Sequence, residues 1–210
     1  MATAQFGGGA RVQGDDRRLA GLLFFILAAQ FMTVIMLAAS IAPRYDYGGA
    51  AISDLGTLGE TAVLFNVSLF VVGALNVIGG YLFYRSHGSR LILAMFVLAG
   101  VGAMGAGALP LNVSDLHGLF AIVAFLFFNL EAIASAGRVD GAMRAISLLA
   151  GVVGIVFVVV MVIGDSGNPA VFGPIGHGGA ERMIVYPVML WMMAFGGYLV
   201  GGPRPTGTDR

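Results

Sequence analysis

The apolar residues of this chain gather into six long runs that are separated by short polar connectors. About 20 mostly apolar residues are needed for a helix to cross the hydrocarbon core of a bilayer. A backbone in lipid must also satisfy its own hydrogen bonds, which favours helices. The sequence therefore predicts an all-α fold, an integral membrane bundle of six transmembrane helices, at residues 19–42, 61–84, 91–109, 117–136, 143–163 and 183–201.

Composition supports a lipid environment and excludes several functions. Hydrophobic residues make up 58% of the 210 residues and charged residues 10%, with a mean hydropathy of +0.91, whereas soluble domains carry about a quarter charged residues. The net charge is zero, so no nucleic-acid partner is expected. The chain has no cysteine and no lysine, which excludes disulfides, thiolate metal sites and Schiff-base chemistry.

Arginine placement predicts the orientation of the helices, because short cytoplasmic loops are enriched in basic residues. In a six-helix arrangement, only Arg44 and Arg182 fall on one side. The other nine arginines fall on the side of both termini. We therefore expect a multi-pass protein of the cell membrane with a cytoplasmic tail at 1–18, a six-helix domain at 19–201 and a cytoplasmic tail at 202–210.

Polar side chains gather on the predicted outer face. Three outer loops of a small bundle must share one surface, so these residues are expected to form a composite site. Candidate ligand-binding residues are Arg44, Asp54, Asn66, Asn112, Asp115, His117, His177, Glu181, Arg182 and Tyr186.

Three predicted helices also begin on the outer face, with unpaired N–H groups and positive dipole ends that attract anions such as phosphate. Arg44 and Arg182 could add charge-assisted contacts to such an anion. The alternative is that Asp54, Asp115 and Glu181 cap these helix ends.

Two histidines are candidates for chemistry on this face. His117 lies at the predicted start of the fourth helix, and His177 lies in a predicted glycine-rich loop. With Asp54, Asp115 or Glu181 they offer the ligand types that zinc accepts in hydrolases, although no His-Glu-x-x-His spacing is present. A hydrogen-bonding or acid–base role for His117 is the other interpretation, so no cofactor is assigned.

Two polar residues, Asn129 and Glu131, lie deep in the predicted fourth helix. Ionisable groups in membranes are costly and usually face the bundle or a wet cavity. We interpret Glu131 as reaching the inner boundary. The sequence offers too few such groups along one face to predict an ion path.

Small residues form stripes on several predicted helices, including Ala99, Ala103 and Gly107, then Gly151 and Gly154, and finally Gly196 and Gly197. Helices in lipid associate through close packing at such residues. Packing within the bundle is the first interpretation. A homo-oligomer or another membrane protein that docks on these faces is the second.

Several short motifs resemble a known family. They are Ile52-Ser53-Asp54-Leu55-Gly56, Phe65-Asn66-Val67-Ser68, Gly107 to Asn112 followed by His117, and Gly178 to Met183 with Tyr186-Pro187 and Trp191. Over residues 20–200 the chain resembles the prokaryotic membrane family catalogued as domain of unknown function 998. The Ile-Ser-Asp element is also similar, more loosely, to one in eukaryotic six-span proteins linked to GPI-lipid remodelling and autophagy modulation. The first resemblance implies a fold and no activity.

The leading functional hypothesis is an outer-face pocket that binds, senses or remodels a polar lipid head group. A second hypothesis makes the pocket a lipid hydrolase or transferase, with His117 as base, Asp54 as its orienting group and Ser53 as nucleophile. A third makes the chain an assembly or stability partner of another membrane complex.

Overall fold

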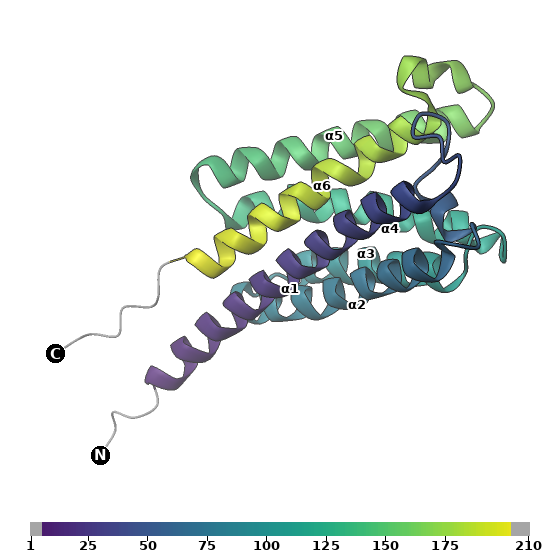
Figure 1. The fold of residues 1–210 in the computed structure, drawn as a ribbon. Helices are drawn as coiled ribbons and strands as arrows, with labels where there is room; N and C mark the ends of the chain where they lie inside the picture. Colours follow the sequence, from purple (N-terminus) through teal and green to yellow (C-terminus); the bar gives the residue numbers. More distant parts are fainter. Residues whose placement is uncertain (1–5, 203–210) are drawn as a thin grey trace.

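Six long helices account for most of the chain and confirm the predicted architecture (Figure 1). The computed structural model describes the backbone of residues 6–202 and the side chains of residues 14–202. Its helices are α1 (Phe6–Ile41), α2 (Ala62–His87), α3 (Arg90–Ala108), α4 (Leu116–Ser135), α5 (Gly141–Asp165) and α6 (Gly176–Gly201). Short 3-10 helices are η1 (Ser53–Gly56), η2 (Ala136–Arg138) and η3 (Pro169–Ile175). All six long helices are apolar enough to cross a membrane, and residues 6–202 include no strand.

Helix bounds follow the predicted runs closely, with one difference that matters for the site. α6 begins at Gly176 and not at 183, so the glycine-rich segment with His177 is helical and not a loop. α1 begins at Phe6, within the predicted tail at 1–18. Of the predicted tail at 202–210, all but Gly202 lies outside the described residues.

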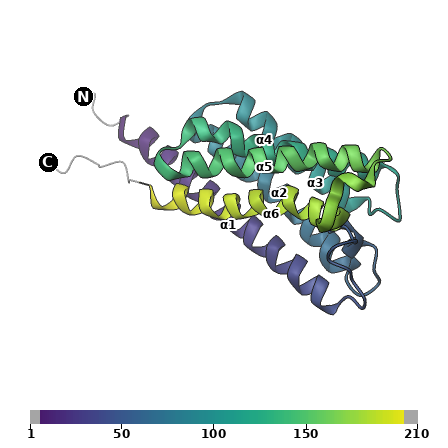
Figure 2. The same cartoon turned by 90° about the horizontal axis from the view of Figure 1, so that it is seen from above.

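The helices form a closed ring. Each helix packs against the next one in the chain, and α6 returns to pack against α1. Both ends of the described chain lie at one end of the bundle, which we call the termini end (Figures 1 and 2). Connectors 42–61, 109–115 and 166–175 lie at the opposite end, which we call the lid end.

Aromatic side chains fill the half of the ring that faces the termini end. The ring of Phe24 stacks on Phe96 at 5.0 Å and lies 5.7 Å from Phe195. Phe195 also contacts Phe83 at 5.3 Å and Trp191 at 4.9 Å between ring centroids. All five are buried, so this half has a dense core contributed by four helices.

The glycine and alanine stripes pack inside the ring. Ala99 and Ala103 are fully buried, and a Cβ at Gly196 would lie 2.5 Å from the Gly21 carbonyl oxygen. In contrast, nothing lies within 4 Å of a Cβ at Gly197. Most of the faces predicted to dock a partner are therefore covered by helices of the same chain, as expected for small residues at helix contacts in lipid.

Candidate functional site

A cavity of about 60 Å³ lies in the half of the bundle that faces the lid end. One water molecule needs about 10–15 Å³ of cavity volume, so this cavity has room for roughly four water-sized groups. Its polar wall residues are Ser53, His117, Asn129 and Glu181. Its apolar wall comes from α1, α2, α3, α4, α6 and the first connector, at Phe31, Ile52, Phe65, Leu69, Val72, Ala103, Ala106, Ala121, Ala124, Phe125, Phe128, Ile184, Val185, Val188 and Met189.

The first connector folds back over this cavity, and we call residues 43–61 the lid. Ile52 and Leu55 are only 2% and 0% exposed although they lie in a connector. The lid is shaped by its own hydrogen bonds: the Ala51 N–H donates to Asp54 Oδ2 at 2.8 Å, and the Thr61 hydroxyl donates to the Leu55 carbonyl at 2.6 Å. The Ile-Ser-Asp motif is therefore part of the lid over the cavity. Neither Ser53 nor Asp54 caps α2, which begins at Ala62.

Arg182 of α6 attaches the lid to the helix bundle through hydrogen bonds. Its Nη1 donates to the backbone carbonyls of Tyr47 at 2.8 Å, Ala50 at 3.3 Å and Gly178 at 2.7 Å, and its Nη2 donates to the Tyr45 hydroxyl at 2.7 Å. The guanidinium carbon also lies 4.8 Å from the Tyr47 ring centroid. A rigid fork of donors suits several acceptors at once. Both terminal nitrogens of Arg182 are thus occupied by acceptors of the lid and of α6, and its Nε is buried without a hydrogen-bond partner among the described residues.

Glu181 and Gly178 complete the attachment of the lid to α6. Glu181 is buried, and its Oε2 accepts a hydrogen bond from the backbone N–H of Ile52. The Gly178 N–H donates to the Gly48 carbonyl at 2.9 Å. A Cβ at Gly178 would lie 2.1 Å from the Ala50 carbonyl oxygen, so glycine permits the lid backbone to approach. The predicted capping role of Glu181 at the start of α6 is wrong, because its carboxylate binds the lid.

Tyr45 lies in the lid, and its pKa is changed by its burial against Arg182. Burial raises the pKa of Tyr45 to about 12, against the opposing effect of the nearby Arg182 guanidinium. The hydroxyl accepts from Arg182 and donates to the Ala51 carbonyl at 2.7 Å. Tyr45 therefore stays a neutral donor and acceptor that links Arg182 to the lid.

His117 faces the cavity in a defined tautomer. Its Nδ1 lies 3.2 Å from the Ala106 carbonyl oxygen and 3.0 Å from the Leu109 carbonyl oxygen. Carbonyls only accept, so Nδ1 carries the hydrogen, and in the neutral ring Nε2 is an acceptor. His117 lines the cavity, which makes Nε2 available to a ligand there.

The predicted catalytic set is not assembled as a triad. The His117 Nδ1 is oriented by backbone carbonyls and not by Asp54, whose carboxylate is bonded within the lid. No hydrogen bond joins Ser53 to His117 among the described side chains, although both line the cavity. The predicted orienting role of Asp54 is therefore wrong.

The two-histidine metal set is also not brought together. His177 Nε2 pairs with Asp165 at 3.2 Å, and its ring packs against Phe172, outside the cavity wall. No group of three His, Asp or Glu side chains that could hold a metal ion occurs among the described residues.

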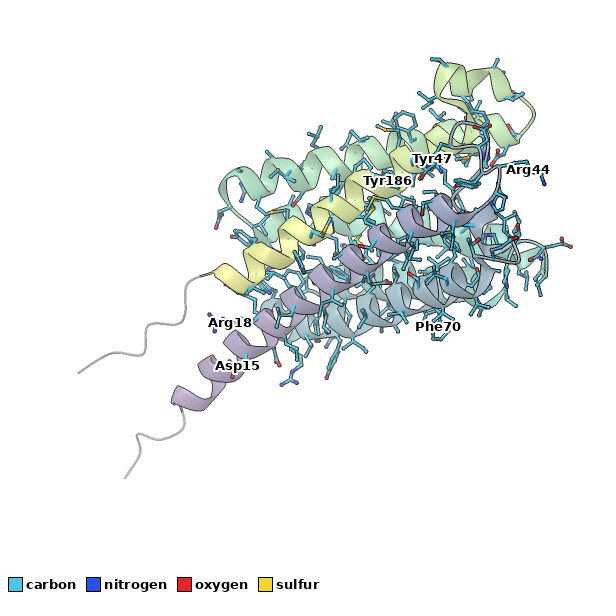
Figure 3. All side chains as sticks on the ribbon, viewed as in Figure 1. Asp15, Arg18, Arg44, Tyr47, Phe70 and Tyr186 are labelled. Carbon is cyan, nitrogen blue, oxygen red and sulfur yellow. The ribbon has the colours of Figure 1, made fainter. Side chains whose placement is uncertain are left out.

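The remaining predicted residues lie around the cavity and do not line it. The Asn66 amide donates to the Gly56 carbonyl at 2.8 Å and so supports η1. Arg44 is exposed and points away from the bundle (Figure 3). Asn112 and Asp115 are exposed, and Asp115 makes no capping hydrogen bond at the start of α4. Tyr186 is half-buried, one helical turn beyond Arg182.

The apolar wall of the cavity was not predicted from the sequence, and the predicted position of Glu131 at the inner boundary is wrong. Pairs of alanines on α3 and α4, at Ala103, Ala106, Ala121 and Ala124, leave the space that larger residues would fill. Glu131 does not reach the boundary of the bundle: it is 0% exposed and packs inside.

Comparison with known proteins identifies the family. The family described as "Protein of unknown function (DUF998)" matches residues 19–198. The chain therefore belongs to this family, which confirms the resemblance seen in its motifs. No curated protein and no solved structure matches the chain.

Proposed function

We propose that the capped cavity binds a membrane lipid, with an apolar chain segment between the helices and a small polar group beneath the lid. One observation carries this proposal: Ser53, His117 and Glu181 all come from the lid end, whereas the rest of the wall is almost entirely apolar. Ligand sites commonly combine an apolar wall with a few convergent polar groups. The amphipathic wall matches an amphipathic ligand.

The size of the cavity favours a slender chain over a fused ring system. A volume of about 60 Å³ accommodates only a few carbon atoms in a row. The rest of a longer chain must leave the bundle. Ala121 and Phe125 are wall residues of α4 that are also partly exposed, so they mark the side at which a chain can pass into the bilayer.

The polar wall favours a head group that donates hydrogen bonds over an anionic one. Glu181 Oε2 is an acceptor, the Nε2 of His117 is an acceptor in the neutral form of its ring, and no arginine lines the cavity. Because Arg182 is bound to the lid and Arg44 is exposed, the head group that we expect is a hydroxyl or an amine and not a phosphate. This narrows the lipid head group that the outer face was predicted to bind.

A matched pair of cavity variants tests lipid binding. Ala121→Phe fills the cavity, and Ala145→Phe adds the same ring to an exposed position on α5. Purified proteins are analysed by native mass spectrometry for retained lipid. We expect Ala121→Phe to lose bound lipid at least about tenfold, a change of about 1.4 kcal/mol, and Ala145→Phe to retain it. Equal retention by both variants would exclude the cavity as the binding site.

The lid end is proposed to face the outside of the cell membrane, as the arginine distribution predicts. The chain has no cysteine, so single-cysteine variants give a clean test. Asn112→Cys at the lid end is expected to react in intact cells with a thiol reagent that does not cross membranes. Asp140→Cys, between α4 and α5, is expected to react only after lysis. The reverse pattern would invert the orientation.

A lipid hydrolase or transferase is the second candidate. The observation that favours it is that a serine, a histidine and a glutamate line one cavity, and catalytic hydrogen bonds often tighten only when substrate binds. Incubation with a total lipid extract, followed by mass spectrometry of the products, tests it. Turnover that is lost in Ser53→Ala and His117→Ala would favour catalysis over simple binding.

A further inference from the structure

A second polar site lies outside the cavity, deep between α2 and α4. Asn76 of α2 and both Glu131 and Ser135 of α4 are 0% exposed. The Asn76 amide donates to Glu131 Oε2 at 3.1 Å and to the Phe96 carbonyl of α3 at 3.0 Å. Ser135 follows Glu131 by one helical turn, so its side chain lies on the same face of α4.

The site has more acceptors than hydrogens to satisfy them. Glu131 Oε1, Asn76 Oδ1 and Ser135 Oγ are all buried without a hydrogen-bond partner. Of these three groups only the serine hydroxyl can donate. Each unsatisfied buried polar atom is costly, so with Glu131 ionised the site lacks at least one hydrogen-bond donor.

No positive charge compensates Glu131 among the described residues. Their ion pairs are Asp16–Arg85, Asp140–Arg144 and Asp165–His177. The other titratable side chains on the helices that form the site, Tyr81, Tyr84, Arg85 and His87 of α2, Arg90 of α3 and His117 of α4, neither hydrogen-bond nor ion-pair with Glu131. An ionised carboxylate buried in a membrane bundle without a partner is strongly disfavoured.

We propose that Glu131 and Asn76, with Ser135 one turn further along the same face of α4, form a proton-binding site in which Glu131 is a neutral carboxylic acid. The proton supplies the missing donor and removes the uncompensated charge in one step. Glu131 then donates through its hydroxyl and still accepts from the Asn76 amide. This site is independent of the lipid cavity, whose wall includes none of the three residues.

A metal cation fits the site less well than a proton. Sodium sites in membrane proteins use backbone carbonyls that are freed where a helix is broken. α2 and α4 run without a break through Asn76 and Glu131, so their carbonyls are engaged in the helices. Four side-chain oxygens remain, two of Glu131 and one each of Asn76 and Ser135, and the Asn76 amide turns its nitrogen toward Glu131.

Infrared spectroscopy of the purified full-length protein in lipid nanodiscs tests the proposal. The chain has three glutamates, Glu60, Glu131 and Glu181, and labelling with ¹³C-glutamate identifies their bands. At pH 7 we expect the carbonyl stretch of a protonated glutamate in the wild type, and we expect its intensity to fall in Glu131→Gln. It should persist in Glu181→Gln and in Glu60→Gln, the exposed control.

The outcomes decide the proposal even when one variant misfolds. Glu131→Gln keeps the shape and supplies an N–H donor, so it should retain the melting temperature of the wild type. If it does not fold, Glu181→Gln leaves Glu131 as the buried glutamate, and its spectrum carries the test. Absence of the band in Glu181→Gln, or a band of undiminished intensity in folded Glu131→Gln, overturns the proposal.

A second experiment tests for a bound sodium ion. The melting temperature is measured while choline chloride is replaced by sodium chloride at constant ionic strength. A ligand that binds only the folded state raises the melting temperature as its concentration rises. We expect no sodium-specific shift in the wild type. A sodium-specific rise that is absent in Glu131→Gln would replace the proton site by a metal site.

Discussion

The two halves of the helix ring are built from the same six helices but are filled differently. Toward the termini end, Phe24 stacks on Phe96 and packs against Phe195, and these rings form a dense core. Toward the lid end, small residues on α3 and α4 leave a cavity that is closed by the lid. We therefore expect the dense half to contribute most of the stability of the chain, and we propose the half with the cavity as the place where a ligand binds.

Removing an aromatic ring should cost far more in the dense half than beside the cavity. We expect Phe195→Ala to lower the free energy of unfolding by about 3–5 kcal/mol, because a fully buried ring leaves a new void. Phe125→Ala, in the cavity wall and partly exposed, should cost less than about 2 kcal/mol. Thermal unfolding in detergent compares the two. Equal losses would contradict the contrast between the halves.

The closed position of the lid should depend on Arg182 and not on Arg44, the arginine within the lid. Arg182→Ala leaves the carbonyls of Tyr47 and Ala50 without their donor, at a cost of about 2–4 kcal/mol. Hydrogen exchange of residues 45–56 should then accelerate by roughly 100-fold. Arg44→Ala, at an exposed position, should leave exchange unchanged. Unchanged exchange in Arg182→Ala would show that the lid is held by other contacts.

Adjacent glycines on α6 probe the closeness of packing in the dense half. Gly196→Ala places a Cβ 2.5 Å from the Gly21 carbonyl and 2.8 Å from the Phe25 backbone nitrogen, so it should destabilise by about 1–3 kcal/mol. Gly197→Ala has open space and should be neutral or stabilise by up to about 1 kcal/mol. Melting temperatures of the two variants check this, and a reversed order would mean that α6 is rotated.

The smallest effect is expected from Tyr45→Phe, which removes one hydroxyl from the lid and should cost about 1 kcal/mol. The pKa of Tyr45 is raised from 10.0 to about 12, so the folded state holds this proton more tightly than the unfolded state. Its contribution to stability is complete below pH 10 and is lost as the pH rises toward 12. An ultraviolet titration of phenolate should lose its component near pH 12 in Tyr45→Phe.

The fold was predictable because hydrophobic length alone sets the number of membrane helices. The start of α6 was not, since Gly176 to Arg182 has the composition of a polar loop and becomes helical by packing against the lid. Ser53, His117 and Glu181 were predicted as site residues and line one cavity.

The role of Arg182 could not be predicted from its local sequence, because its acceptors in the lid lie about 135 positions away in the sequence. The same holds for Asn76, which meets Glu131 across 55 positions. Nothing in the sequence around either residue shows which distant backbone or side chain it contacts.

Photolabelling tests most directly whether the cavity holds an apolar chain. A long-chain alcohol with a photoreactive group in its alkyl chain is added to the purified protein, and labelled residues are mapped by mass spectrometry. We expect labels on wall residues such as Phe125 and Met189, and we expect these labels to be lost in Ala121→Phe. Labels confined to exposed positions such as Leu149 and Val159 would contradict it.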